Sequence, residues 1–386
     1  MKIVHLCLAC FFPSGHSYQE NLLPKYHKKM GYDVEVIAST FGFNQNGCPC
    51  YEYEREGVSF NEHGIKVTRI PYKFKKAFAF KFRFFKSLKK SLNLSSPDIL
   101  FIHGCQFKDI SIVVDFLKKH PNVVTYVDNH ADFSNSAVSW FSKNIMHGVV
   151  WRYYAKLINP FVKKWYGVLP ARVDFLKDVY GLPAEKIDFL PMGADDDMVE
   201  KYSSPAIRAS YRRKYGIDDK DFLIVTGGKI NFAKKQTLLL MDAVNQIDNP
   251  KLKLIVFGSI APELKNEVEQ RCSDKVKYIG WLSSEESYPH FAMADLVAFS
   301  GRHSVFWEQV AGMGMPMLVK YWTGTTHIDM GGNVKFLYND SLEEIKKNIS
   351  DIFFKAELKK MKAVAESNKN FFSYRDIAKR CVNINV

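Results

Sequence analysis

With 386 residues, of which 47% are hydrophobic, the chain is too long for one ordinary core, and we expect two domains. This hydrophobic content excludes extended disorder except at the last few residues. The formal net charge of +13 predicts an anionic partner, which on charge alone is nucleic acid, anionic lipid or a phosphorylated ligand.

The cysteines and the first residues indicate a cytosolic protein. Seven cysteines are scattered along the chain, and the spacing of Cys48 and Cys50 is not that of a CxxC redox or zinc motif. We therefore expect reduced thiols. Residues 1–15 are apolar, but they lack a small-x-small cleavage site and end in a Pro-Ser-Gly turn, so we interpret them as a buried strand and not a signal peptide. No stretch approaches the roughly 20 apolar residues of a membrane span.

In the first half of the chain, short apolar segments alternate with longer helical ones. This repetition predicts a parallel sheet covered by helices on both faces. A Pro-Met-Gly-Ala turn at 191–194 and an acidic run at 195–197 then indicate a domain boundary. The expected strands are 3–8, 33–38, 66–70, 99–103, 123–127, 167–169 and 187–190.

The alternation restarts after residue 220. It predicts a second doubly wound domain, with helical segments such as 237–247 and 263–271 between the strands. Two such halves joined by a linker predict a cleft between two domains. The expected strands of the second half are 222–226, 253–257, 276–279, 296–299 and 316–319.

The segment 298–319 is the most informative one. Its strand breaks at Ser300 and restarts as a helix, and open α/β sheets bind ligands where a loop enters a helix beside the carboxyl end of a strand. Backbone amides at the start of this helix, at Ser304 and Val305, suit a phosphate. Glu308 can accept a hydrogen bond from a sugar hydroxyl. This combination is typical of the donor pocket of an enzyme that uses a nucleotide-sugar.

A glycine- and lysine-rich loop, GGKINFAKK at 227–235, follows the expected strand 222–226. Glycines after a strand, such as Gly228, let the backbone approach a ligand closely. Lys229 and Lys235 converge at a strand-to-helix turn, which suits a diphosphate. The alternative interpretation is a solvated lysine cluster on the surface.

Two loops of the first half are weaker candidates. The turn at Gly15 follows the first strand and can present amides to a phosphate, although an ordinary turn is an equal alternative. His130 follows the strand 123–127, between Asp128 and Asp132. We interpret His130 as a group that contacts a sugar or phosphate; a metal site with its two acidic neighbours and a structural histidine are the alternatives.

The segment 72–91 contains eight Lys or Arg, seven aromatic residues and no acid. At helical spacing its aromatic and basic residues fall on separate faces, which is typical of an interfacial helix on anionic lipid. The alternatives are an apolar face packed on the sheet and a nucleic-acid patch, for which no motif exists. The expected membrane contacts are Lys76, Phe78, Phe82, Arg83, Phe85, Lys86 and Lys90.

Taken together, these residues resemble the family 4 glycosyltransferases. The resemblance covers nearly the whole chain and is strongest over 181–319, where 181–187 and 190–195 look like the family's inter-domain signature. Residues 372–374 look like the segment that leads the last helix back to the N-terminal domain. The order of the intervening pieces also matches: GGKINFAKK, IVFG, YIGWLSSEE, ADLVAFS and WEQVAGMGMP.

The resemblance implies an α/β protein of the GT-B fold, with two doubly wound Rossmann-like domains facing across a cleft. We expect an N-terminal acceptor-binding domain at 1–195 and a nucleotide-sugar-binding domain at 196–370. Residues 371–386 would form a helix that crosses back to the N-terminal domain.

Site roles also follow from the resemblance. Lys229 stands where the family usually has Arg and Lys235 where it has Lys, and both would hold the donor diphosphate. His130 matches a histidine near the transferred sugar, and Glu308 matches the second of the family's paired glutamates, which binds the ribose. Gly15 matches the glycine loop that faces the phosphates. The nucleobase would lie near Tyr278, Ile279 and Gly280.

The chain departs from the family pattern at two positions. The first of the paired glutamates, which normally contacts the donor sugar, is Ser300 here, and a gap would bring His303 to that place. Neither residue is a carboxylate, which implies a different donor, a different sugar orientation or a lost activity. Gln236 stands where the family usually has Gly.

The sequence therefore predicts a retaining hexosyltransferase that moves a sugar from a nucleoside-diphosphate donor to a hydroxyl of a glycan, expected to be lipid-linked, such as a capsule, O-antigen or exopolysaccharide. It would act in the cytoplasm as a peripheral protein on the inner face of the plasma membrane, with no metal or other cofactor and no nucleic acid. The alternative is an inactive GT-B-fold accessory protein that binds a glycan or a partner glycosyltransferase. A nucleotide-sugar epimerase is a further, weaker alternative.

Overall fold

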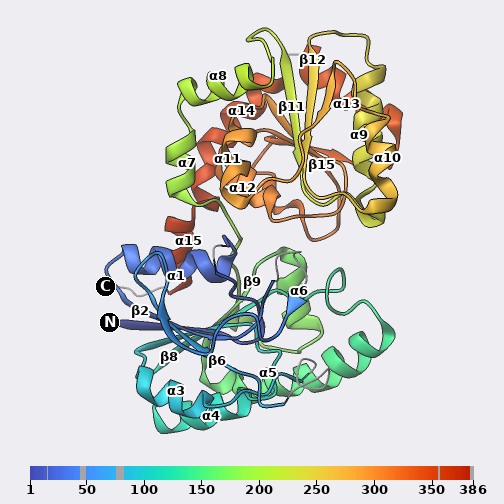
Figure 1. Cartoon of the computed structure of the whole chain (residues 1–386). Coiled ribbons are helices and arrows are strands. Elements are labelled where there is room, and N and C mark those ends of the chain that lie inside the picture. Colours follow the sequence, from blue (N-terminus) through green and yellow to red (C-terminus); the bar gives the residue numbers. More distant parts are fainter. Residues whose placement is uncertain (15, 44–48, 75–81, 355–356, 383–386) are drawn as a thin grey trace. The chain divides into compact units, whose positions relative to one another are not determined.

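The computed structural model describes the chain except residues 15, 44–48, 75–81, 355–356 and 383–386. It divides into two compact units (Figure 1). Unit 1 comprises Met1–Pro191 together with Ile377–Val386, and unit 2 comprises Met192–Asp376. These limits fall at 191 and 376, whereas the sequence placed the boundaries at 195 and 370.

Unit 1 is built on an eight-stranded sheet with the order β10-β9-β8-β7-β1-β2-β6-β5. Its strands pair in parallel except β5, which runs antiparallel to β6. A separate antiparallel pair joins β3 (Gly42–Phe43) and β4 (Pro49–Cys50). The strands of the large sheet are β1 Lys2–Cys7, β2 Asp33–Ser39, β5 Gly57–Phe60, β6 Lys66–Ile70, β7 Ile99–His103, β8 Val124–Asn129, β9 Val162–Gly167 and β10 Ile187–Phe189.

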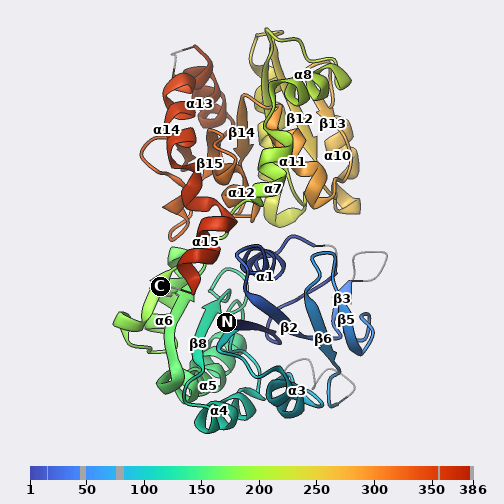
Figure 2. The ribbon, with the colours of Figure 1, turned by 90° about the vertical axis from the view of Figure 1, so that its left-hand side faces the viewer.

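Helices cover both faces of this sheet (Figures 1 and 2). Helices α3, α4 and α5 lie along one face, and α1 and α15 lie along the other. The π-helix η1 runs directly into α5, so residues 142–158 form one continuous helix. The helices are α1 Gln19–Lys29, α3 Leu88–Ser95, α4 Ile110–Lys119, η1 Ser142–Trp151, α5 Arg152–Ile158, α6 Pro170–Asp178, α15 Tyr374–Cys381 and the 3₁₀ turns Asn159–Phe161 and Ala184–Lys186.

Unit 2 contains a six-stranded sheet with the order β13-β12-β11-β14-β15-β16, in which all pairings are parallel. Separate apolar clusters pack on the two faces of this sheet, as expected for strands that are buried on both sides. The strands are β11 Phe222–Gly227, β12 Leu252–Phe257, β13 Val276–Tyr278, β14 Leu296–Phe299, β15 Met317–Lys320 and β16 Val334–Leu337.

The helices of unit 2 alternate with its strands. Helix α11 begins with a capping box, in which the Ser283 and Glu286 side chains bond each other's backbone amides. The helices are α7 Asp196–Tyr202, α8 Pro205–Lys214, α9 Gln236–Gln246, α10 Lys265–Glu269, α11 Ser284–Ala292, α12 Phe306–Gly312, α13 Leu342–Phe354, α14 Glu357–Asn368 and the 3₁₀ turns Phe232–Lys234, Pro262–Leu264, Thr326–Ile328 and Lys369–Phe372.

The predicted α/β class with two Rossmann-like domains is confirmed. Each sheet is parallel over most or all of its pairings and is covered by helices. The expected strands are present except the one at 167–169, which the structure places earlier, as β9 at Val162–Gly167. The structure adds β16 at the edge of unit 2, the antiparallel strand β5 at the edge of unit 1 and the pair β3–β4. Strand β5 is exposed along its whole length, so it lacks the buried face from which a strand is predicted.

The predicted interfacial helix over 72–91 is wrong in the part that the structure describes. Helix α3 begins only at Leu88, and Arg83 has a φ of 53°, which no helix interior accommodates. Phe85 forms an isolated antiparallel bridge with Tyr72 and is buried in the unit 1 core. Lys76 and Phe78 lie outside the described residues.

The remaining residues of that prediction are divided between core and surface. The Arg83 guanidinium donates to the backbone carbonyls of Ala9 and Gln106, and Phe82 packs against the apolar core of unit 1. Lys86 and Lys90 are exposed. Phe82 and Phe85 therefore pack on the protein itself, and no helix among the described residues is long and apolar enough to cross a membrane.

Candidate active site

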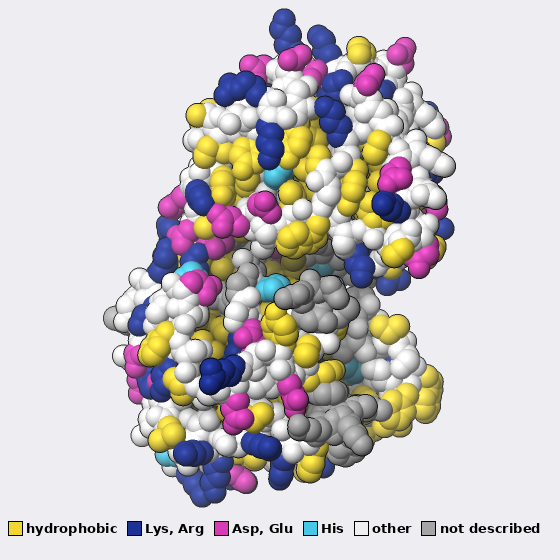
Figure 3. Space-filling model, in the orientation of Figure 1, with side chains coloured by type: hydrophobic (Ala, Val, Ile, Leu, Met, Phe, Trp, Pro, Cys, Tyr) yellow, Lys and Arg dark blue, Asp and Glu magenta, His cyan; other side chains and the backbone are white. Residues whose placement is uncertain are grey.

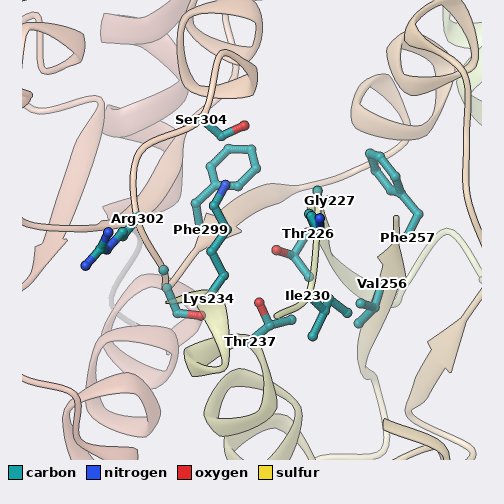
Figure 4. A pocket seen from close by; sticks show the side chains of 14 residues that line it. Thr226, Gly227, Ile230, Lys234, Thr237, Val256, Phe257, Phe299, Arg302 and Ser304 are labelled. Atoms are coloured by element: carbon teal, nitrogen blue, oxygen red, sulfur yellow. The ribbon is translucent and has the colours of Figure 1, made fainter. Parts of the chain in front are cut away.

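A pocket opens in unit 2 at the carboxyl ends of β11, β12 and β14 (Figure 4). Open α/β sheets bind ligands at this edge. The pocket brings together Gly228, Lys229, Ser300 and Ser304, four residues that the sequence placed in a donor site. The complete lining is Thr226, Gly227, Gly228, Lys229, Ile230, Lys234, Thr237, Val256, Phe257, Phe299, Ser300, Gly301, Arg302 and Ser304.

The floor of the pocket depends on tightly packed glycines. A Cβ atom on Gly227 would lie 2.1 Å from the Phe257 ring, and one on Gly258 would lie 1.9 Å from the Gly228 carbonyl oxygen. Gly228 has a φ of 124°, a region that L side chains rarely adopt. The loops after β11 and β12 therefore pack backbone to backbone, and the Gly228 amide donates to the Phe257 carbonyl at 3.1 Å.

The pocket contains a lysine that the sequence analysis did not select. Lys234 is half-buried and reaches across the pocket toward Ser304, whereas Arg302 points away (Figure 4). Burial lowers the pKa of Lys234. Lys235 is exposed at the position before α9 and is absent from the pocket lining. The sequence does not show which of two adjacent lysines enters a pocket. Only the directions in which their side chains leave the 3₁₀ turn distinguish them.

Glu308 is fully buried in α12 and accepts two hydrogen bonds from histidines. His303 Nε2 lies 2.8 Å and His327 Nε2 lies 2.9 Å from the same carboxylate oxygen, Oε1. Burial alone would raise the pKa of Glu308, but the two imidazoles, His303 foremost, lower it to about 2. The second oxygen, Oε2, has no hydrogen-bond partner among the described residues. Glu308 and His303 do not line the pocket, and a buried carboxylate oxygen without a partner calls for a donor.

The side chains at both departures from the family pattern are hydrogen-bonded, and that of Gln236 donates to Asp340 Oδ2 at 3.1 Å. The Ser300 hydroxyl donates to the Gln236 carbonyl at 2.9 Å, so it fastens the loop after β14 to the start of α9. His303, and not Ser300, contacts Glu308. Val305 is exposed immediately before α12. His327 was missed, because it lies nineteen residues beyond Glu308 in a loop with no motif.

The predicted nucleobase segment 278–280 follows β13. The Tyr278 hydroxyl donates to the Gly258 carbonyl at 2.6 Å, and the Gly258 amide donates to the Gly280 carbonyl at 2.8 Å. Tyr278, Ile279 and Gly280 do not line the pocket, although Tyr278 is joined to its floor through Gly258.

In unit 1, His130 follows β8 and lies beside two carboxylates. Its Nε2 atom lies 3.4 Å from Asp128 Oδ2 and 3.9 Å from Glu20 Oε1. Asp132 is occupied elsewhere, since it accepts from Arg172 Nε at 2.9 Å and from the Ser134 amide at 2.6 Å. Gly15 lies outside the described residues.

Behind Asp128, three fully buried histidines form a continuous hydrogen-bonded chain. His103 Nδ1 lies 2.8 Å from Asp128 Oδ2, and His103 Nε2 lies 3.0 Å from His5 Nδ1. His5 Nε2 lies 3.0 Å from His27 Nδ1, and His27 Nε2 lies 3.0 Å from the Ala378 carbonyl oxygen in α15. The chain thus connects the carboxyl end of β8 with the last helix of the protein.

The ends of this histidine chain dictate its protonation. The Ala378 carbonyl and the Asp128 carboxylate are both acceptors, so each terminal imidazole must donate outward. The two bonds between imidazoles and the two outward bonds each need one N–H proton, so the three imidazoles together carry four protons, one more than three neutral imidazoles do. The extra proton resides on His103, because the Asp128 carboxylate outweighs burial and raises the pKa of His103 to about 9. Burial lowers the pKa of His27 to about 4 and that of His5 well below its usual value.

His103, Asp128 and His130 have the spacing of metal ligands, with their ligand atoms within 4.8 Å of one another. The protonation of the histidine chain argues against metal binding by these residues. While His103 carries the extra proton, both of its ring nitrogens are donors, and it has no lone pair for a metal ion. The same proton neutralises the Asp128 carboxylate, so these residues do not fit a resident metal.

Comparisons with known proteins agree with this fold. Residues 21–198 match the model of Glycosyltransferase Family 4. A GDP-mannose-dependent alpha-(1-6)-phosphatidylinositol monomannoside mannosyltransferase of Mycobacterium tuberculosis is 26% identical over 140 residues, 35% of this chain. The match spans only 36% of that relative, about a third of its length.

Solved structures share the fold over the whole length of the chain. Anabaena Alr3699/HepE in complex with UDP superposes with a TM-score of 0.68 at 16% identity, covering 99% of this chain and 98% of that one. WaaG, a glycosyltransferase involved in lipopolysaccharide biosynthesis, superposes with a TM-score of 0.62 at 14% identity, covering 99% and 100%. Residues 21–198 thus resemble glycosyltransferase family 4, and over its whole length the chain has the GT-B fold.

Proposed function

We propose that the protein transfers a sugar from a nucleoside-diphosphate sugar to a hydroxyl of a lipid-linked bacterial glycan, with retention of configuration. The observation that carries this proposal is the unit 2 pocket, in which Lys229 and Lys234 accompany a glycine-lined floor at the carboxyl edge of a parallel sheet. A diphosphate needs cations and a backbone that it can approach closely, and no other ligand class suits this combination as well.

In this proposal, the two lysines act mainly on the leaving group. Cleavage of the sugar–phosphate bond leaves a nucleoside diphosphate with added negative charge. Cations that are already positioned by the fold stabilise that charge without reorganising at the moment of reaction. The half-buried Lys234 is the stronger candidate, because partial burial strengthens its attraction to a phosphate. No metal is then needed to neutralise the diphosphate.

Glu308 would hold the ribose of the donor. Its Oε1 is already bonded by His303 and His327, and its Oε2 is left to accept from hydroxyl groups. The low pKa, about 2, keeps the carboxylate ionised at every pH at which the protein would work. An ionised acceptor binds a hydroxyl more strongly than a neutral one.

His130 would contact the transferred sugar or the acceptor. The Asp128 carboxylate lies 3.4 Å from its Nε2 atom, and the histidine chain holds Asp128 in place from behind. The retaining outcome and the role of His130 come from the family resemblance. A lipid-linked acceptor is supported by the names of two similar proteins, one a phosphatidylinositol monomannoside mannosyltransferase and one involved in lipopolysaccharide biosynthesis. We place the protein in the cytoplasm, on the inner face of the plasma membrane.

Calorimetric titration with UDP, GDP, TDP and CMP tests the proposal. We expect one nucleotide to bind selectively and Glu308→Gln to weaken it by roughly tenfold or more, since a hydrogen bond to a charged group is worth about 1.5–3 kcal/mol. Glu343→Gln, on the exposed first turn of α13, is the matched control and should bind as the parent does. Absence of nucleotide binding would refute the donor pocket.

One observation favours a different function. The position of the family's first glutamate is Ser300, whose hydroxyl is engaged with the Gln236 backbone, so no carboxylate is available there to contact a donor sugar. An inactive GT-B-fold protein that binds a glycan or a partner glycosyltransferase would need no such carboxylate. Selective nucleotide binding without sugar transfer to any acceptor in a lipid-linked glycan panel would support this second function. Release of a free altered sugar would indicate an epimerase.

A further inference from the structure

The apolar side chains that unit 1 exposes are concentrated in one segment, residues 133–153. Trp140 is 73% exposed and Val138 70%, and Val149 and Tyr153 are each 60% exposed. Figure 3 shows a cluster of hydrophobic side chains on the side of unit 1 where the η1–α5 helix lies in Figure 1. Soluble proteins rarely expose so many large apolar side chains together unless they bind something. The members of this apolar face are Phe133, Val138, Trp140, Phe141, Ile145, Val149 and Tyr153.

The helix η1–α5 presents these side chains on its outer side. Phe141, Ile145, Val149 and Tyr153 follow one another at intervals of four residues, so they lie on one helical face. Other residues of the same helix, Met146, Trp151, Ala155 and Ile158, are buried in the core of unit 1. An ordinary surface helix places polar residues opposite its buried face. This helix is apolar on both, so its outer face is built to meet a second apolar environment.

The charge of the chain segment that carries the apolar face has one sign. Residues 133–173 contain no Asp or Glu, although the chain has 41 of them, and they contain six Lys or Arg. Lys164 and Arg172 are paired with Asp188 and Asp132. The other four are distributed along the apolar face and just beyond it: Lys143, Arg152, Lys156 and Lys163. An apolar stripe edged by cations is the pattern of a helix that lies in the interface of an anionic membrane.

We propose that the apolar face of 133–153 rests on an anionic lipid bilayer, with Trp140 and Phe141 at the level of the headgroups and Lys143, Arg152 and Lys156 against the phosphates. The inference deepens the proposed function, on which it rests for the lipid-linked acceptor, and it assigns membrane contact to a segment other than 72–91. A second copy of the chain fits this face less well, because a self-complementary contact would bring cations against cations. Nucleic acid would leave the aliphatic side chains without a partner.

Vesicle binding of the full-length protein tests the proposal. The probe is a vesicle of phosphatidylcholine with phosphatidylglycerol, compared with phosphatidylcholine alone, and the readouts are co-sedimentation and tryptophan fluorescence. We expect binding to the anionic vesicles with a blue shift of the emission. Trp140→Ser/Phe141→Ser should lower the partition coefficient at least tenfold and remove the shift, and Lys143→Gln/Arg152→Gln/Lys156→Gln should lower it by a similar factor.

Three controls keep the test specific. Trp281→Ser in unit 2 is matched to Trp140, since its side chain is 70% exposed, and it should bind vesicles as the parent does. Lys86→Gln/Lys90→Gln should also bind normally, and loss of binding in that variant alone would overturn the assignment. Circular dichroism spectra identical to those of the parent show that the variants fold.

Two further outcomes would overturn the proposal. One is a parent protein that binds neither kind of vesicle. The other is a concentration-dependent dimer that Trp140→Ser/Phe141→Ser dissociates, which would assign the apolar face to a second copy. Nucleotide titration without vesicles separates this inference from the proposed function, because the Trp140 and Phe141 variant should bind the nucleotide like the parent whether or not the membrane proposal holds.

Discussion

His103 Nδ1 lies 2.8 Å from Asp128 Oδ2, and both side chains are completely buried. Burial by itself would favour the neutral imidazole, but the adjacent carboxylate outweighs it and raises the pKa of His103 to about 9. The imidazolium in turn holds the pKa of Asp128 well below its usual range. The pair is the charged end of a histidine chain that runs from β8 to α15, so the ionisation of one residue is coupled to the packing of the last helix.

This coupling predicts how stability depends on pH. His103 titrates near 6.5 in an unfolded chain and at about 9 in the folded one, so its contribution is complete below roughly pH 6.5 and is lost as the pH rises through 9. His27, whose folded pKa is about 4, must stay neutral, so stability also falls as the pH drops below roughly 6.5. Urea unfolding should show a maximum near pH 6.5 and a loss on the order of 1–3 kcal/mol by pH 9.5.

His103→Gln tests the assignment. Removing one partner of a buried pair costs about 3–5 kcal/mol, and the alkaline decline should disappear because the titrating group is gone. His120→Gln, at an exposed position just after α4, should reproduce the parental profile. An alkaline decline that persists unchanged in His103→Gln would contradict the proton assignment.

The opposite end of the histidine chain predicts a local effect on α15. His27→Phe removes the stronger of two side-chain donors to the Ala378 carbonyl and leaves the weak Cys381 thiol at 3.3 Å, and an under-satisfied buried acceptor costs about 1–3 kcal/mol. We expect the amides of α15 to exchange with deuterium roughly 5- to 150-fold faster, as measured by mass spectrometry of the C-terminal peptide. His63→Phe, on the exposed turn between β5 and β6, is the control; equal exchange in the two variants would refute the coupling.

The adjacent lysines after the 3₁₀ turn predict a sharp contrast. Lys234→Ala should weaken nucleoside-diphosphate binding roughly tenfold or more, because a charged donor in the pocket is lost, whereas Lys235→Ala should change it less than about threefold. Calorimetric titration of the two variants with the same nucleotide measures both effects. A larger loss of nucleotide affinity for Lys235→Ala than for Lys234→Ala would mean that the position inferred from the family resemblance is correct. The phosphate would then not bind in the pocket that the structure shows.

The environment of Glu308 predicts that nucleotide affinity becomes sensitive to the ionisation of Glu308 only in a variant that lacks both histidines. In the parent, the two imidazoles keep the pKa of Glu308 at about 2, so its ionisation does not change between pH 5 and pH 8. In His303→Gln/His327→Leu burial is no longer opposed by the imidazoles, and the pKa should rise. The ratio of variant to parental nucleotide affinity should then fall with decreasing pH over roughly pH 7 to 5.

The phosphate of the nucleotide also titrates, but its effect is the same for both proteins. Dividing the variant affinity by the parental affinity therefore removes it. His290→Gln, remote from Glu308 and bonded to Tyr215, provides the control and should leave the ratio flat. A ratio that is independent of pH in the double variant would mean that the histidines do not set the ionisation of Glu308.

Much of the fold could be predicted from local pattern. Parallel strands that are buried on both faces appear as short apolar runs, and the runs at 222–226 and 253–257 lie within a residue of β11 and β12. Glycine after β11 likewise marks the unit 2 pocket, which Gly228 lines. These features depend on a few adjacent residues, so the chain itself displays them.

The segment 72–91 shows the limit of such patterns. Its aromatic and basic faces predicted a lipid-facing helix, whereas Phe85 is buried in the core of unit 1 and Arg83 bonds two backbone carbonyls there. A pattern states that a face is apolar, but not whether protein or lipid covers it. The apolar face at 133–153 shows the opposite outcome, since it is exposed. The sequence does not reveal this exposure, because it depends on which surfaces the rest of the chain covers.

The sequence by itself therefore determined the α/β class, the order of the strands along the chain and the region of the donor pocket. Tertiary structure alone decided that Lys234 and not Lys235 enters the pocket, that His327 joins His303 on Glu308, and that three distant histidines meet in one chain. The physical reason is the same in each case. Local conformation follows from neighbouring residues, whereas the protonation and contacts of a buried polar group follow from partners that folding brings to it from far along the chain.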